Sequence, residues 1–325
     1  MNSASGQSSP ALIGASGDSL REAFGLSLVA VAEEFPNMVV LDADVAGGTG
    51  AHHFRAAYPS RFFQFGIAEQ NMVSAAAGMA AAGLLPVVTT FAVFHLRALE
   101  QARLSVAYPR RNVKLVASHP GLDVGPDGGS AQALEDIAAF RAVPGMTVLS
   151  PADPGEMHHA VRAMLTYEGP IYMRTGRSPA QRVPQLEAEF HIGKGTILCE
   201  GSDATIVACG VGVARAVAAA EQLRSEGVQV RVVSMSSIKP IDQELLRECS
   251  EQTGCIVTVE DHNVFGGLGG AVAEAVVKAR PCPVEFVGVN DVFGESGEPE
   301  ELAKKYGIDE SAVADAVRRV LGRKS

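Results

Sequence analysis

Hydrophobic residues fill residues 62–94 almost without a break, and they follow two different patterns. Residues 68–82 are rich in alanine and glycine and predict a helix against whose backbone another helix could pack. Residues 62–65 before this helix and residues 86–91 after it predict short buried strands. The uncharged part of the run is long enough to span a bilayer, but Pro86 and the change of pattern predict a buried helix and strand, so no membrane segment is expected.

Glu69 is the one acidic side chain in this run, and it falls in the first turn of the predicted helix. A surface helix cap is one explanation, because helix N-termini attract carboxylates. The apolar neighbours of Glu69 favour burial instead, and a buried carboxylate is costly unless a partner shares a hydrogen bond or a proton with it. Glu69 is therefore the first candidate for a functional residue.

Strands and helices alternate along most of the chain, which predicts parallel sheets covered by helices on both faces. The first series has strands at 38–42, 62–65, 86–91, 113–118, 147–149 and 171–174, and helices at 20–35, 68–82, 95–108, 134–141 and 154–167. The second series has strands at 204–209, 228–233, 256–260 and 284–289, and helices at 211–226, 243–249, 271–278 and from 311 onward. Prolines and mixed charge between the two series predict a linker.

These patterns divide the chain of 325 residues into four parts. Residues 1–17 predict a disordered leader, because Ser, Gly, Ala and Gln dominate them. Residues 18–182 predict a first α/β domain, residues 183–193 the linker, and residues 194–325 a second, smaller α/β domain.

Composition narrows the class of protein. Hydrophobic residues make up 47% and charged residues 20%, as in ordinary globular proteins. The net charge of -10 argues against nucleic-acid and anionic-membrane partners, which need a basic face. The five cysteines match no zinc or redox spacing, and the N-terminus lacks the basic start of a secretory signal. Reduced thiols in a cytoplasmic protein are the simplest expectation.

Ligands of open parallel sheets gather at the carboxyl ends of the strands. In the first domain that rule selects Asp44, the turn before Glu69, Phe91, His119 and Arg174. No metal site is expected, because adjacent histidines at 52–53 and at 158–159 should point to different sides of an element.

The motifs around Glu69 resemble the transketolase family. FGIAEQNMVSAAAGMAAAG followed by TTFAVF is similar to the pyrimidine-binding domain of that family, and most similar to the C-terminal subunits of split, two-subunit transketolases. REAFG, LDAD and DGGSAQALED fit the same domain, and EDHNVFGGLGGAVAE resembles the family's C-terminal domain. The resemblance covers nearly the whole chain and implies a pyrimidine-binding domain followed by a transketolase C-terminal domain.

The resemblance implies thiamine diphosphate as the cofactor. Glu69 would be the catalytic carboxylate that binds N1′ of the aminopyrimidine, and Phe91 and Phe94 would form the wall of the ring pocket. Asp44 is placed with these cofactor-binding residues.

The resemblance also implies a set of substrate-binding residues. They are Arg21, His119, Asp127 and Arg174, with His119 also moving protons. Two positions depart from the family: Arg97 stands where a third ring is common, and Ala131 replaces a second substrate histidine. These departures leave the donor sugar open.

The chain lacks the G-D-G…N segment that binds Mg²⁺ and the diphosphate in thiamine enzymes. The resemblance therefore implies a partner, an N-terminal transketolase subunit that holds Mg²⁺ and shares the cofactor in an α2β2 assembly. The expected activity is transfer of a two-carbon ketol unit from a ketose, by family resemblance a phosphate ester, to an aldehyde. Transfer to a lipoyl or carrier-protein acceptor, or a non-catalytic partner subunit, are the alternatives.

Overall fold

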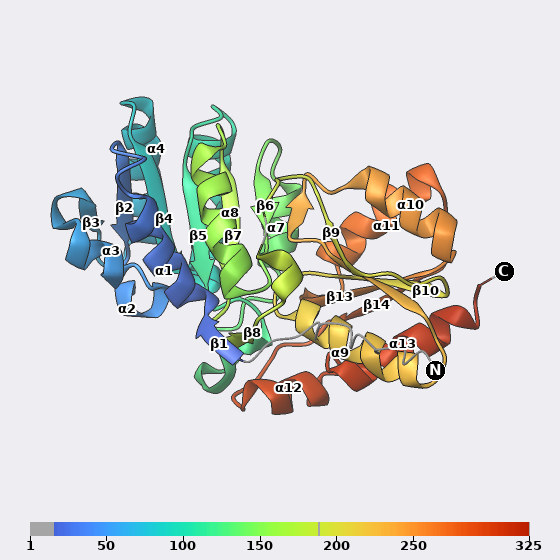
Figure 1. Cartoon of the computed structure of the whole chain (residues 1–325). Coiled ribbons are helices and arrows are strands. Elements are labelled where there is room, and N and C mark those ends of the chain that lie inside the picture. The colour runs from blue at the N-terminus through green and yellow to red at the C-terminus, as the bar shows by residue number, and fades with distance from the viewer. Residues whose placement is uncertain (1–15, 188, 325) are drawn as a thin grey trace, which may run out of the picture.

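A computed structural model describes residues 16–187 and 189–324 (Figure 1). Residues 1–15 of the expected leader lie outside the described residues. Ser16 and Gly17, which we had assigned to the leader, belong instead to strand β1 (Ser16–Ser19). This strand pairs antiparallel with β8 (Pro179–Gln181), so the start of the described chain is joined to the end of the first domain.

The first domain is built on a seven-stranded sheet of order β12-β6-β7-β5-β4-β2-β3. Six strands run parallel, and β12 at one edge is antiparallel. In that order the strands are Ser237–Lys239, Thr147–Leu149, Ile171–Thr175, Lys114–Ser118, Leu85–Phe91, Met38–Asp42 and Phe62–Gln64.

Helices cover both faces of this sheet because alternate strand residues point to opposite sides. One face packs against α1 (Leu20–Val31), α2 (Ala46–Thr49), α3 (His52–Ala57) and α8 (Pro154–Thr166). The other packs against α4 (Glu69–Ala81), α5 (Ala92–Arg97), α6 (Leu99–Gln101), η2 (Ala102–Ala107) and α7 (Asp136–Ala142). Three short 3₁₀ segments connect elements: η1 (Pro59–Arg61), η3 (Leu122–Asp127), which is kinked at Gly125, and η4 (Pro184–Leu186).

The second domain has a five-stranded sheet of order β14-β13-β10-β11-β9, in which only β9 is antiparallel to its neighbour. These strands are Val284–Val289, Ile256–Asn263, Ala204–Ala208, Val230–Ser234 and Thr196–Cys199. One face packs against α9 (Gly212–Ser225), α12 (Pro299–Lys305) and α13 (Glu310–Leu321), and the other against α10 (Gln243–Thr253) and α11 (Leu268–Ala279).

The two domains share one apolar core along their seam. Strand β12 leaves the second domain to pair with β6, and one hydrophobic cluster runs from α4 through the first sheet to α10 and α11 (Figure 1). From the first domain, Gln132 Nε2 donates a hydrogen bond of 2.9 Å to the carbonyl oxygen of Glu295 in the second domain. The end of the second domain therefore packs against the loop that carries Asp127.

The alternation of two parallel α/β domains is confirmed, with local differences. Strand β3 was expected to be buried, but as an edge strand it leaves Phe63 38% exposed. The helix expected at 95–108 is broken into α5, α6 and the π-helical turn η2. The five cysteines are free thiols, as expected. Among the described residues, no helix has the length and hydropathy needed to cross a bilayer.

Candidate functional site

Glu69 begins α4 and is almost completely removed from solvent, with 3% of its surface exposed. The preceding residue, Ala68, has no side chain that could cap the helix. The nearest cation is Arg97, whose Nη1 lies 3.6 Å from Glu69 Oε2, outside hydrogen-bond range. Among the described residues, no donor makes a hydrogen bond to the Glu69 carboxylate. Glu69 is thus a buried acid with unused acceptor capacity, which favours a ligand over a helix cap.

Three rings and one guanidinium form a continuous row beside Glu69, which we call the aromatic row: Arg97, Phe94, Phe91 and His119. The Arg97 guanidinium lies 5.8 Å from the Phe94 ring centre, and the Phe94 and Phe91 rings stack with centroids 5.4 Å apart. Phe91 stacks in turn on His119 at 3.8 Å. The row therefore joins Glu69, at the Arg97 end, to the substrate-binding candidates at the His119 end.

His119 follows β5 and adopts a left-handed backbone with φ 58°. Such backbone is uncommon for a residue other than glycine and occurs often at functional sites. Its Nδ1 lies 2.9 Å from Ser118 Oγ, and its Nε2 lies 3.8 Å from Asp127 Oδ2. Burial lowers the pKa of His119 to about 4, and the charges of Arg21 and Arg177 act in the same direction. His119 is therefore neutral near pH 7.

Two arginines lie on the His119 side of the site. Arg21, at the start of α1, donates from Nη1 to the carbonyl oxygen of Gly48 at 3.3 Å, and its buried Nε has no partner among the described residues. Arg177 lies 3.5 Å from Asp127 Oδ1, and 30% of its side chain is exposed. Gly48 packs closely on Phe91, because a Cβ at this position would lie 2.7 Å from the Phe91 ring. Cationic donors thus flank the imidazole.

Asp44 lies at the carboxyl end of β2, as expected, and is exposed with a left-handed φ of 63°. Its backbone N–H donates to Gln64 Oε1 at 2.9 Å. The neighbouring Asp42 is the buried acid of this strand end, and it accepts a hydrogen bond from Gln64 Nε2 at 2.7 Å. Burial raises the pKa of Asp42. No hydrogen bond or ion pair among the described residues joins Asp44 to the aromatic row.

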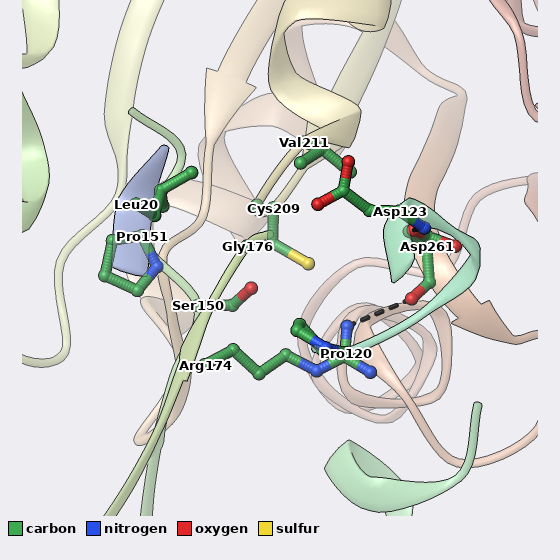
Figure 2. Close-up of a pocket in the computed structure, with 11 residues that line it drawn as sticks. Leu20, Pro120, Asp123, Ser150, Pro151, Arg174, Gly176, Cys209, Val211 and Asp261 are labelled. Atoms are coloured by element: carbon green, nitrogen blue, oxygen red, sulfur yellow. Dashed lines mark hydrogen bonds between the residues drawn. The ribbon is translucent and has the colours of Figure 1, made fainter. Parts of the chain in front are cut away.

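Among the described residues, the side-chain partners of Arg174 are Asp136 and the backbone of Asp261, and not the other substrate-binding candidates. Arg174 is buried at the seam of the two domains, where it forms an ion pair with Asp136. Its Nη1 donates to the carbonyl oxygen of Asp261 at 3.0 Å (Figure 2). The cavity beside it measures about 20 Å³, which is room for one water molecule. The charge of Arg174 is therefore compensated by Asp136 within this chain.

Four residues of the site were missed or undervalued in the sequence. Arg97 looked like a departure from the family, yet it contacts both Glu69 and Phe94. Arg177 lies three residues after Arg174, and nothing in the sequence shows which of the two faces Asp127. Gly48 belongs to a glycine-rich loop whose contact with Phe91 depends on tertiary packing. Gln64 lies in a predicted strand and gave no signal of its own.

A two-domain parallel α/β chain with a buried acid and stacked rings at the carboxyl ends of its strands is the architecture of a cofactor-binding enzyme domain. Residues 17–182 match the family described as "Transketolase, pyrimidine binding domain", and residues 193–313 match "Transketolase, C-terminal domain". The chain belongs to the transketolase family, which confirms the resemblance seen in the sequence.

Relatives of similar length match nearly the whole chain. The chain is 42% identical to a putative transketolase C-terminal section of Methanocaldococcus jannaschii, covering 92% of this chain and 95% of that protein. It is 38% identical to a 6-deoxy-6-sulfo-D-fructose transketolase subunit of Clostridium sp., covering 94% and 95%. A solved structure described as a split gene transketolase, inactive beta4 tetramer, superimposes with a TM-score of 0.89 at 47% identity, covering 95% of this chain and all of that one.

Proposed function

We propose that this chain is the C-terminal subunit of a thiamine-diphosphate-dependent, two-subunit transketolase-like enzyme. It would transfer a two-carbon ketol unit from an anionic ketose, such as a ketose phosphate, to an aldehyde acceptor. The observation that carries the proposal is the Glu69 carboxylate, which is 3% exposed, accepts no hydrogen bond among the described residues and lies beside stacked aromatic rings. The similarity to subunits of split transketolases supports the same function.

The residues present fit the pyrimidine half of the cofactor. When bound, thiamine diphosphate supplies a nucleophilic carbon that can carry the two-carbon unit. Glu69 would accept a hydrogen bond from N1′ of the aminopyrimidine, and its low-dielectric surroundings would make that bond stronger than in water. The half-buried Phe91 and Phe94 would exclude water from the ring.

The residues on the His119 side fit the substrate. Because His119 is neutral near pH 7, its Nε2 could take a proton from a sugar hydroxyl while Asp127 holds the resulting charge. Arg21 and Arg177 would bind the terminal anion of the sugar. Arg177 would thus take the role that the family resemblance implies for Arg174. A sulfonate would suit the same two guanidinium groups, and the Clostridium relative is named for a sulfo sugar.

The diphosphate and Mg²⁺ would be held by an N-terminal partner subunit in an α2β2 assembly. We therefore expect the purified chain alone to bind no thiamine diphosphate. Isothermal titration calorimetry with Mg²⁺ present measures this, and micromolar binding by the lone chain would contradict the split site. The relative described as an inactive tetramer of one chain type supports this expectation.

The central test is Glu69→Gln in the complex with the partner subunit. We expect a loss of kcat of about 100-fold or more, because the amide cannot supply the negative charge at N1′. The measurement is ketol transfer with phosphorylated and sulfonated ketoses as donors. Glu100→Gln is the matched control, because Glu100 is an exposed acid in α6 whose side chain, among the described residues, forms a hydrogen bond with Gln101 alone. A Glu69→Gln complex with wild-type kcat would refute the proposed role.

A further inference from the structure

A second cluster of ligating side chains lies beside the candidate site, on α1 and α3. It consists of Glu22, His52 and His53, whose ligand atoms all lie within 4.8 Å of one another. His53 Nε2 lies 2.7 Å from Glu22 Oε2. The two imidazole rings lie 4.0 Å apart, centre to centre, with an angle of 36° between them. Our expectation that adjacent histidines point to different sides is therefore wrong for this pair.

Close packing of two glycines explains why these three side chains meet. A Cβ on Gly25 of α1 would lie 2.1 Å from the carbonyl oxygen of Gly50, and a Cβ on Gly50 would lie 2.1 Å from the carbonyl oxygen of Arg21. Gly50 also has a φ of 77°, which favours glycine. The turn that begins α3 can thus pack closely against α1. This packing places His52 and His53 next to Glu22, which lies in the first turn of α1.

The hydrogen bonding of the cluster leaves ligand positions available. His52 Nδ1 is buried and has no hydrogen-bond partner among the described residues, so no protein group competes for it. His53 and Glu22 are about one third exposed, at 30% and 33% of their side chains, which leaves a path from solvent. Imidazole nitrogen and carboxylate oxygen are ligands that Zn²⁺ prefers, and three protein ligands leave a fourth position for water.

We propose that Glu22, His52 and His53 form a binding site for a divalent transition metal of the Zn²⁺ type. Two ligand atoms on one tetrahedral Zn²⁺ lie roughly 3.4 Å apart, so modest side-chain rotations would close the present cluster around the ion. The ion would join α1 to α3 one residue from Arg21 and four residues from Gly48, and so would fix the loop that packs on Phe91. This site does not depend on thiamine diphosphate or on a partner subunit.

Titration of the full chain with Co²⁺ and Zn²⁺ tests the proposal. We expect one equivalent of Co²⁺ to produce the visible absorption of a near-tetrahedral site, and Zn²⁺ to displace it. His52→Ala removes a ligand without breaking a protein hydrogen bond, and Glu22→Gln keeps a hydrogen-bond acceptor for His53. Each change is expected to weaken Zn²⁺ binding at least about tenfold.

The second histidine pair provides a matched control. His158 and His159 are also adjacent on a helix, but their rings lie 5.7 Å apart at 74°, and they contact Ser27 Oγ and the Glu187 carbonyl oxygen. The double variant His158→Ala/His159→Ala should bind Zn²⁺ as the wild type does. The proposal is overturned if the wild type gives no Co²⁺ spectrum at about 0.1 mM, if His52→Ala binds equally well, or if the control variant alone loses the metal.

Discussion

Two regions of the molecule bury an acidic side chain, and they differ in whether neighbouring groups compensate its charge. At the domain seam, Asp136 accepts hydrogen bonds from Tyr172 Oη at 2.6 Å and Arg174 Nε at 2.8 Å, and it also pairs with Arg174 Nη2. At the candidate site, the one charged partner of Glu69 among the described residues is the exposed Arg97 at 3.6 Å. Both acids are nearly inaccessible to solvent, so the difference lies in compensation, not in burial.

This difference is the one expected between a structural charge and the functional charge that we propose for Glu69. A buried ion pair persists where hydrogen bonds satisfy both partners, and the Arg174–Asp136 pair meets that condition. Burial alone would raise the pKa of Asp136, but the charge and hydrogen bonds of Arg174 hold it below its usual value. A buried acid without such partners lowers the folding stability of the isolated chain. Proteins retain such an acid where a ligand binds to it.

The largest expected effect comes from breaking the seam. Asp136→Ala leaves the Arg174 guanidinium, 6% exposed, without a counter-charge. We expect the free energy of unfolding to fall by about 3–5 kcal/mol, as measured by urea denaturation. Arg162→Ala is the matched control, because Arg162 forms a bidentate ion pair with Glu34 and both side chains are about half exposed. Loss of this pair should lower the free energy of unfolding by less than about 1 kcal/mol. Equal losses in the two variants would contradict the comparison.

A smaller effect is expected in how the stability of the seam depends on pH. Glu156 is a seam acid that accepts hydrogen bonds from the Ala152 backbone N–H at 2.6 Å and from Ser236 Oγ at 2.9 Å. Burial raises the pKa of Glu156 from 4.5 to about 7. The folded state therefore binds more protons than the unfolded state between pH 4.5 and 7, and this acid's contribution to stability falls as pH rises through that window.

Glu156→Gln should remove this contribution, about 1–3 kcal/mol across the window. The measurement is urea denaturation of both proteins at pH 5 and pH 8. Glu260 is also buried with a pKa of about 7, so the wild-type slope contains both acids and only the difference between the two proteins reports Glu156. Parallel stability curves for wild type and variant would show that Glu156 does not titrate in this range.

Much of the fold was predictable because the core strands carry local signals. The strands at 38–42 and 147–149 were predicted with the bounds that the structure has, since short apolar runs between turn residues specify buried parallel strands. The short strands β9 and β12 were not predicted. Each has three or four residues and pairs antiparallel with a strand distant in sequence, so tertiary contacts decide its conformation.

The candidate site was predictable only in part, for a related reason. The burial of Glu69 followed from its apolar neighbours, and the structure confirms it. The burial of Arg174 did not follow, because Asp136 lies 38 residues away and the backbone of Asp261 lies in the other domain. Sequence spacing identifies which side chains lie at strand ends, but the partner across the seam decides whether a charge there is free or compensated.

The smallest expected effect on stability is that of Glu69→Gln, the change that should most reduce activity. The amide keeps the shape of the acid, removes a charge that burial opposes and loses only a long, partly solvated pair with Arg97. We expect the free energy of unfolding of the isolated chain to change by less than about 0.5 kcal/mol, or to rise slightly. Arg97→Ala should be equally mild, since 57% of its side chain is exposed. If Glu69→Gln instead costs 2 kcal/mol or more in urea denaturation, then Glu69 is a structural acid like Asp136, and the contrast between the two regions does not hold.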